Sequence, residues 1–453
     1  MSGPWHLLLQ IHAAGRWNDA AQLTLSDPER GWQGSSQLAY DDAWVFDADP
    51  DMVGNARGWQ ALSVRLPPSL QVQGFKTWPP FLLDLLPQGH ARRVLAEALQ
   101  LDPNAAACDA PLLLRAAGDP IGNIRIKQAW DAEWERISQA PKHPGLTLDE
   151  LFERGDAFNE FARDFAAQAS GSSGVQGAWP KLLMTRNAAG RWLPDPMVPD
   201  DEASDHAILK WVSDRAEVTG LILTAEAPYL ELARAFGLRC ARPLMHRQGT
   251  LLIPRFDRVV DAGRVVRLGQ ESLISAAGVA AFGHQTSHDV YLAVIKDCCD
   301  DPASEVTEYL LRDVLNLALG NPDNHGRNTA LQKTADGGVR LTPLYDFCPM
   351  RLDPSGIARS TTWKCMKPLV GPSRDLNPDW EIVCRVAAAD VPGLEAEALM
   401  AMLASKADCL RRMPERARDI GVPDAVIAGA MGFCDRHADA LAALGRGRSH
   451  APR

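Results

Sequence analysis

The alternation of apolar and polar residues predicts short strands and turns in the first part of the chain. Residues 61–66 alternate strictly and predict a strand. A helix is expected over residues 81–101, and the turn residues at 119–123 lead into a last strand at 124–126. Residues 127–145 are polar and predict a connector to a second unit. The first part therefore reads as an α/β module.

The pattern changes from about residue 150. A helix, a Gly/Ser-rich turn and strands are expected through about residue 258, and helical spacing dominates afterwards, as at Leu399, Leu403 and Leu410. The predicted division is an N-terminal module at 1–130, a linker and small nucleotide-binding lobe at 131–260, a helical catalytic lobe at 261–445 and a flexible tail at 446–453.

Composition limits the partners and the compartment. The 453 residues, 46% of them hydrophobic, favour more than one packed unit. A net charge of −10 provides no global basic field, so nucleic acid would be reached only through a partner. The nine scattered cysteines form no C-x-x-C pair, which indicates reduced thiols, and no apolar stretch approaches the roughly 20 residues of a membrane span. We expect a cytoplasmic protein without a membrane segment.

The strongest chemical signal lies between residues 320 and 346. Asp323 and Asn328 have the D-x-x-x-x-N spacing of a kinase catalytic loop, and a predicted strand–turn–strand returns Asp346 beside them. Phosphoryl transfer from ATP needs a carboxylate beside the attacking hydroxyl and oxygen ligands for Mg²⁺. His325 could orient Asp323, contact the substrate or make a structural hydrogen bond. An isolated turn is the plainer interpretation of the segment alone, because Asn, Asp, Pro and Gly all favour turns.

A second set of residues fits a nucleotide-binding lobe. The small-residue loop at 170–177 could bring backbone amides close to phosphates, although a flexible linker would look similar. Lys210 closes an apolar strand, as the lysine of a V-A-I-K strand does. Glu226 follows Thr224, a plausible N-cap, and is predicted to pair with Lys210. A surface lysine and a solvated glutamate are the alternative.

In order along nearly the whole chain, these residues resemble the HipA-type serine/threonine kinases, the toxins of bacterial toxin–antitoxin modules. The segments that carry the resemblance are 38–44, 61–67, 84–89, 113–122, 176–181, 208–210, Glu226 with 232–238, 255–258, 321–328 and 345–346. The resemblance implies an α+β fold: an N-terminal α/β module followed by a protein-kinase-like bilobal fold with a mainly helical C-terminal lobe.

The resemblance also implies roles for single residues. Asp323 would be the catalytic base, and Asn328 and Asp346 the Mg²⁺ ligands. The implied ATP-binding residues are Val175, Gln176, Gly177, Lys181, Lys210, Glu226, Phe256 and Asp257.

Autophosphorylation of a loop serine is implied too, with Ser172 and Ser173 as candidates. Two features depart from the family pattern: extra residues between Gln176 and Pro180, and Pro254 where an acidic residue often stands. The extra residues affect the fit of the loop to phosphate, and neither departure touches Asp323, Asn328 or Asp346.

The predicted function is an ATP-dependent protein serine/threonine kinase that phosphorylates itself and a protein target, such as an aminoacyl-tRNA synthetase, and so arrests growth. A DNA-binding antitoxin of HipB type is the predicted partner, with nucleic acid reached only through it. Two alternatives stay open: a small-molecule phosphotransferase, which shares the Asp, Asn and Asp spacing, and a non-catalytic co-repressor that docks on a DNA-binding antitoxin.

Overall fold

The computed structural model describes residues 3–50, 56–139, 142–155, 158, 179–212, 217–261, 263–368 and 376–446. The chain divides into two units, each assembled from separate stretches of sequence. Unit 1 comprises Met1–Ser213, Leu244–Phe282 and Leu331–Val339, and unit 2 comprises Asp214–Pro243, Gly283–Ala330 and Arg340–Arg453.

Unit 1 begins with an antiparallel sheet in the order β4-β3-β2-β1-β5. Its strands are β1 (Trp5–Ala13), β2 (Arg16–Leu25), β3 (Ser36–Tyr40), β4 (Gln73–Phe75) and β5 (Ile124–Ile126). Leu7, Leu9 and Ile11 alternate along β1 and are all buried, so one face of the strand forms core. Ala14 and Gly15 have positive φ angles, as a two-residue hairpin turn requires.

Four helices and three short 3₁₀ turns complete this part of unit 1. They are α1 (Asp42–Ala48), α2 (Gly89–Ala98), α3 (Asp109–Ala116), α4 (Lys127–Gln139), η1 (Pro28–Gln33), η2 (Pro80–Asp84) and η3 (Ala106–Cys108). Their buried side chains, among them Phe81, Leu82 and Leu112, share one apolar core with the sheet.

Three local predictions for this part differ from the structure. The helix expected over 81–101 is divided into η2 and α2, because Pro87 cannot continue a helix. The expected connector begins as helix α4, whose Glu133 is buried against Arg115, with a 2.9 Å ion pair. Residues 61–66 form no strand and make one isolated bridge, from Ser63 to Leu66. Their polar groups bond elsewhere, since the Ser63 hydroxyl and the Val64 amide donate to the Glu271 carboxylate.

A second sheet of unit 1 has the order β7-β6-β8-β10-β9. Its strands are β6 (Lys181–Asn187), β7 (Trp192–Pro194), β8 (Ala203–Trp211), β9 (Met245–Arg247) and β10 (Thr250–Pro254). Leu182, Met184 and Leu209 pack with Phe152 of α5 (Leu148–Glu153). The remaining elements here are η4 (Asp195–Met197), the hairpin of β11 (Arg258–Asp261) and β12 (Arg264–Arg267), β13 (Gly269–Ser272) and α8 (Leu273–Ala276).

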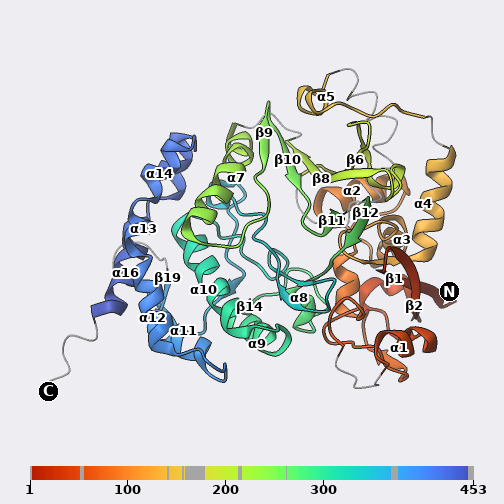
Figure 1. Cartoon of the computed structure of the whole chain (residues 1–453), viewed down its shortest axis with the longest axis horizontal. Helices are drawn as coiled ribbons and strands as arrows, with labels where there is room; N and C mark the ends of the chain where they lie inside the picture. Colours follow the sequence, from red (N-terminus) through yellow and green to blue (C-terminus); the bar gives the residue numbers. More distant parts are fainter. Residues whose placement is uncertain are drawn as a thin grey trace. The chain divides into compact units, whose positions relative to one another are not determined.

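Unit 2 is mainly helical. Its helices are α7 (Glu217–Phe236), α9 (His288–Cys298), α10 (Pro302–Ala318), α11 (Trp380–Ala388), α12 (Ala396–Ser405), α13 (Ala407–Arg411), α14 (Met413–Asp419), α15 (Asp424–Ala430), α16 (Cys434–Arg446) and the 3₁₀ turn η5 (Met350–Leu352). Figure 1 shows α11, α12, α13 and α16 packed together toward the end of the chain. Thr224, predicted as an N-cap, lies inside α7 instead, and its hydroxyl donates to the Gly220 carbonyl.

The short strands of unit 2 are β14 (Thr286–Ser287), β17 (Thr361–Thr362), β18 (Met366–Pro368) and β19 (Leu376–Pro378). Two further strands, β15 (Ala330–Lys333) and β16 (Val339–Leu341), form a sheet in the order β13-β15-β16, and residues 331–339 belong to unit 1. β15 and β16, joined by a turn at residues 335–337, confirm the expected strand–turn–strand after Asn328. Within the described ranges, no helix has the length and apolarity that a bilayer crossing requires.

Candidate active site

The loop that carries Asp323 and Asn328 begins at the end of α10. Asn321 anchors its start, because the Asn321 side-chain amide donates to the Asn316 side chain at 2.8 Å. The Asn321 side-chain oxygen in turn accepts from the Asp323 backbone amide at 3.2 Å. Asn316 belongs to a helix that is buried along most of its length, so the loop starts from a rigid support.

Asp323 and Asn328 meet across this loop. The Asn328 side-chain amide donates to the Asp323 carbonyl at 2.7 Å, and its nitrogen lies 3.5 Å from Asp323 Oδ2. Because the amide nitrogen is used in this way, Oδ1 is the Asn328 atom that can coordinate a cation. The Asp323 side chain is 27% exposed, so its carboxylate can be reached from solvent.

His325 lies beside the Asp323 carboxylate. Its Nε2 is 3.6 Å from Asp323 Oδ1, and its Nδ1 accepts from the Arg327 backbone amide at 3.2 Å. Burial lowers the pKa of His325, and this outweighs the opposite effect of the nearby Asp346 charge. A neutral ring that accepts at Nδ1 carries its proton on Nε2, which faces Asp323. The 3.6 Å separation from Asp323 is longer than a hydrogen bond, so the roles proposed for His325 stay predictions.

Asp346 is tied to the same loop through its neighbour. The Tyr345 hydroxyl donates to the Arg327 carbonyl at 2.8 Å, which holds the segment after β16 against the loop. Asp346 has a φ of +51°, a left-handed conformation that side chains other than glycine seldom adopt. Such strained positions persist only where surrounding contacts enforce them, and they cluster at active sites.

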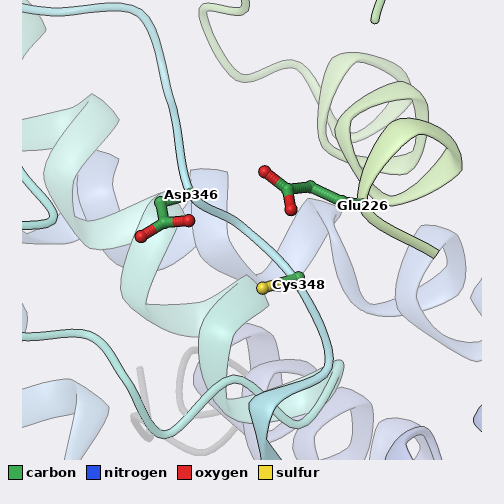
Figure 2. Close-up of side chains that lie close together, drawn as sticks. All are labelled: Glu226, Asp346 and Cys348. Atoms are coloured by element: carbon green, nitrogen blue, oxygen red, sulfur yellow. The ribbon is translucent and has the colours of Figure 1, made fainter. Parts of the chain in front are cut away.

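Two further side chains converge on Asp346. Glu226 reaches from α7 toward the segment after β16, which also carries Cys348 (Figure 2). The ligand atoms of Glu226, Asp346 and Cys348 lie within 4.8 Å of one another. Glu226 and Cys348 are both buried. The sequence singled out Glu226 and Asp346 but not Cys348, which no spacing pattern marked.

The buried carboxylate of Asp313 binds Asn324 of the loop that carries Asp323. Asp313 of α10 accepts from the Asn324 side-chain amide at 3.1 Å, from Arg359 at 2.6 Å and from the Trp363 indole at 2.7 Å. The His288 ring stacks on Trp363, and its Nε2 lies 3.4 Å from Asp313. Burial alone would raise the pKa of Asp313, but Arg359 and the other donors outweigh it and lower this pKa. Asp313 therefore stays charged and fixes Asn324, the residue after Asp323.

Two lysines of unit 1 lie directly opposite each other on neighbouring strands. Lys181 begins β6 and is the register partner of Lys210 on β8. Opposed residues of an antiparallel pair project to the same side of the sheet, so two ammonium groups share that side. Lys210 is buried, and its Nζ lies 4.6 Å from the centre of the Trp179 ring. Neighbouring ammonium groups favour a bound anion. The predicted pairing of Lys210 with Glu226 stays a prediction.

Asp257, which with Phe256 was predicted to bind ATP, lies in a buried ion-pair network of unit 1. Arg255 forms hydrogen bonds with both Asp257 oxygens, at 2.8 and 2.5 Å, and also pairs with Asp195. The Gly122 backbone amide donates to Asp257 at 2.9 Å. The Phe256 carbonyl accepts from the Gln332 side chain at 3.2 Å. These contacts give Asp257 a structural role, and its part in nucleotide binding stays a prediction.

The same network continues to Asp119. Arg258 and Arg267 donate to the same Asp119 oxygen at 2.9 and 2.5 Å, and Arg258 also lies 3.2 Å from Asp195. Sequence reasoning missed this network, although an Arg-x-x-Arg pair that enters a β-hairpin was a visible signal. The predicted residues Ser172, Ser173, Val175, Gln176 and Gly177 lie outside the described residues.

The chain belongs to the HipA family. The family model described as HipA-like C-terminal domain matches residues 173–409, which is more than half of the 453 residues. The model described as HipA N-terminal domain matches residues 34–127. The predicted family is therefore confirmed over both parts of the chain.

Individual proteins agree with this assignment. A protein of Sinorhizobium fredii (strain NBRC 101917 / NGR234) named "Putative kinase Y4mE" is 29% identical over 331 residues, which cover 69% of this chain and 72% of that protein. HipA of Shewanella oneidensis MR-1, solved in complex with HipB and its operator DNA, covers 97% of this chain and 96% of its own, with a TM-score of 0.57 and 17% identity. A sequence identity of 17% shows that the two proteins share a fold and nothing more. The predicted fold class is therefore confirmed.

Proposed function

We propose that this chain is an ATP-dependent protein serine/threonine kinase of the HipA toxin type. The observation that carries the proposal is the meeting of Asp323 with Asn328 in a half-exposed loop, to which the Tyr345 hydroxyl ties Asp346. Two carboxylates and an amide on one loop system are the groups that phosphoryl transfer requires. Membership of the HipA family and the relative named as a kinase support this choice.

Asp323 takes the role of base in this proposal. Its carboxylate accepts the proton of the substrate hydroxyl, and His325 keeps it oriented through the Nε2 side of the ring. Asn328 Oδ1 and the Asp346 carboxylate fit Mg²⁺, because both are oxygen donors, the kind that a hard cation prefers. A bound Mg²⁺ would neutralise charge on the nucleotide phosphates.

Lys181 and Lys210 are the proposed phosphate contacts from unit 1. Their register pairing on β6 and β8 puts two cations on one side of the sheet, which suits a triphosphate. Val175, Gln176, Gly177, Phe256 and Asp257 complete the proposed nucleotide set on the basis of the family resemblance.

Autophosphorylation at Ser172 or Ser173 is part of the proposal. A phosphoserine adds roughly −1.5 to −2 charges at pH 7, which would repel the ATP phosphates and lower nucleotide affinity. Intact-mass spectrometry after incubation with Mg²⁺-ATP should show added phosphate in the wild type and none in a Ser172→Ala/Ser173→Ala variant. Wild-type protein that phosphorylates a substrate and gains no phosphate itself would contradict this part.

The protein target and the antitoxin partner follow from the same assignment. We infer that the target is a protein of translation, such as an aminoacyl-tRNA synthetase, whose phosphorylation arrests growth. The HipA relative solved with HipB and operator DNA supports a DNA-binding antitoxin of HipB type as partner. With a net charge of −10, this chain would reach DNA through that partner.

The decisive experiment is phosphate transfer from labelled ATP to proteins of a cell lysate. Asp323→Ala should lower transfer by about 10²- to 10⁴-fold with little change in thermal unfolding, because a loop carboxylate adds little to the core. The control is Asp439→Ala, which removes an aspartate that is 70% exposed on α16 and should leave transfer intact. Undiminished transfer by folded Asp323→Ala protein would rule out Asp323 as the base.

A further inference from the structure

Glu226, Asp346 and Cys348 place ligand atoms of two chemical kinds around one point. Among the described residues, these carboxylate oxygens and the Cys348 Sγ all lie within 4.8 Å of one another (Figure 2). Glu226 is 3% exposed and Cys348 is 2% exposed. Magnesium chemistry does not account for the sulfur, because Mg²⁺ takes oxygen ligands and thiolates select softer metals.

Packing holds the three side chains in place. Tyr229 lies about one turn after Glu226 on α7, and its ring contacts Phe347, the residue between Asp346 and Cys348, with centroids 5.6 Å apart. The Tyr229 hydroxyl donates to the Leu319 carbonyl at 3.1 Å. Tyr229 and Phe347 are both buried, so separating α7 from the segment after β16 would expose two aromatic rings. The ligand set is thus held together before any metal arrives.

The donor set matches a zinc-type metal. Zn²⁺ binds cysteine sulfur and carboxylate oxygen, and a tetrahedral zinc site holds its ligand atoms about 3.5 Å apart. Binding of the metal would contract the present separations, which are at most 4.8 Å, toward that spacing.

We propose that Glu226, Asp346 and Cys348 form a binding site for Zn²⁺ or a metal of similar softness, and that this metal inhibits the enzyme by occupying Asp346. The Cys348 thiol proton passes to solvent on binding, since the thiolate is the ligand. The inhibitory half rests on the proposed function, in which Asp346 holds Mg²⁺. The binding half stands without it.

Cobalt(II) provides a direct test of metal binding, because Co²⁺ binds in tetrahedral zinc sites and its thiolate complexes have a characteristic absorption band. Reduced, metal-free full-length protein titrated with Co²⁺ should develop a thiolate-to-cobalt charge-transfer band that saturates at one equivalent and disappears when Zn²⁺ is added. Cys348→Ser should abolish the band, and Glu226→Gln should weaken Co²⁺ binding by about tenfold or more. Cys434→Ser is the matched control, because Cys434 is equally buried in unit 2 and should be dispensable.

A folded wild type without the band, or a band that survives in Cys348→Ser, would overturn the proposal. If Cys348→Ser does not fold, as judged by thermal unfolding, an unchanged Co²⁺ affinity in Glu226→Gln overturns it instead. The inhibitory half is tested by phosphate transfer, with each protein's rate divided by its own rate without Zn²⁺. The Zn²⁺ concentration that halves the rate should be about tenfold higher for Cys348→Ser than for the wild type. A protein that shows the Cys348-dependent cobalt band but transfers no phosphate would contradict the proposed kinase function and leave the metal site standing. A protein that transfers phosphate but shows no band would contradict the metal site and leave the kinase function standing.

Discussion

Aspartates in two regions of the molecule experience opposite environments. Asp119, Asp195 and Asp257 of unit 1 are at most 3% exposed, and each is paired with at least one of Arg255, Arg258 and Arg267. Asp323 and Asp346 of unit 2 are only partly buried and lie on loops. A carboxylate of the first kind is a structural anion, because bonds to buried arginines keep it charged and fixed. The second kind keeps the access that a substrate or cation needs.

Protonation separates the two regions further. Burial alone would raise the pKa of Asp257, but Arg255, Arg258 and the Gly122 amide lower it to about 2. A carboxylate held at that pKa is a poor proton acceptor near neutral pH, since the best bases have a pKa close to the working pH. Residue type alone would not have distinguished these aspartates from the catalytic candidates.

After Asp323→Ala, the largest effect on the unit 2 side is expected from Asp346→Asn. An amide removes the negative charge that a hard cation prefers, so the rate of phosphate transfer should fall by about a thousandfold at millimolar Mg²⁺. Part of the loss should return at higher Mg²⁺. Rates measured across a Mg²⁺ series check this, and a series that superimposes on the wild type would exclude Asp346 as a ligand.

Arg255→Met should produce the largest effect on the unit 1 side, and on stability. It leaves the buried Asp195 and Asp257 short of a partner, which should lower the free energy of unfolding by about 3–5 kcal/mol. Urea unfolding measures the change. Arg418→Met, which removes an exposed pair with Asp424, is the control and should unfold at nearly the wild-type midpoint. Equal midpoints for both variants would contradict a structural role for the network.

Asp313→Asn tests whether the buried Asp313 of unit 2 contributes only to stability, as the buried aspartates of unit 1 do, or also positions the loop that carries Asp323. The amide keeps the shape but loses the charge that holds Arg359 and orders Asn324. We expect kcat to fall by about tenfold to a hundredfold, because a misplaced catalytic group is costly, while the nucleotide KM changes little. A variant that loses stability alone, with kcat intact, would place Asp313 with the structural set.

The smallest effect is a pH dependence from His288. Burial lowers the pKa of His288 to about 4, against the opposing charge of Asp313, so the folded protein binds fewer protons than the unfolded chain between pH 6.5 and 4. The contribution of His288 to the free energy of unfolding should therefore be complete above pH 6.5. It should decrease as the pH falls toward 4, by at most about 1.4 kcal/mol per pH unit. His288→Gln should flatten that slope in unfolding measured at pH 7.5 and pH 5. An identical slope would assign the acid sensitivity to other groups.

Local pattern was enough to predict part of the site. The D-x-x-x-x-N spacing predicted that Asp323 and Asn328 would meet, and a β-hairpin is a local structure whose turn residues are visible in sequence, so the position of β15 and β16 could be predicted as well. The apolar run that ends at Lys210 likewise located β8. Family membership followed from the order of such motifs.

Other features depended on tertiary structure. Residues 61–66 have the alternation of a strand, but Ser63 and Val64 bond to Glu271, about two hundred positions away in sequence. The polar segment that begins at Lys127 folds as helix α4, in which the buried Glu133 pairs with Arg115 of α3, 18 positions earlier in the chain. No local rule could supply those partners.

The sequence by itself determined the family, the alternation of elements and the spacing of the catalytic loop, because these depend on contacts between near neighbours along the chain. The tertiary structure decided which aspartates are anions of the core and which are open to solvent, and it brought Cys348 beside Glu226 and Asp346. The physical reason is that burial and ion pairing arise from segments distant in sequence, whose approach depends on the packing of the whole unit.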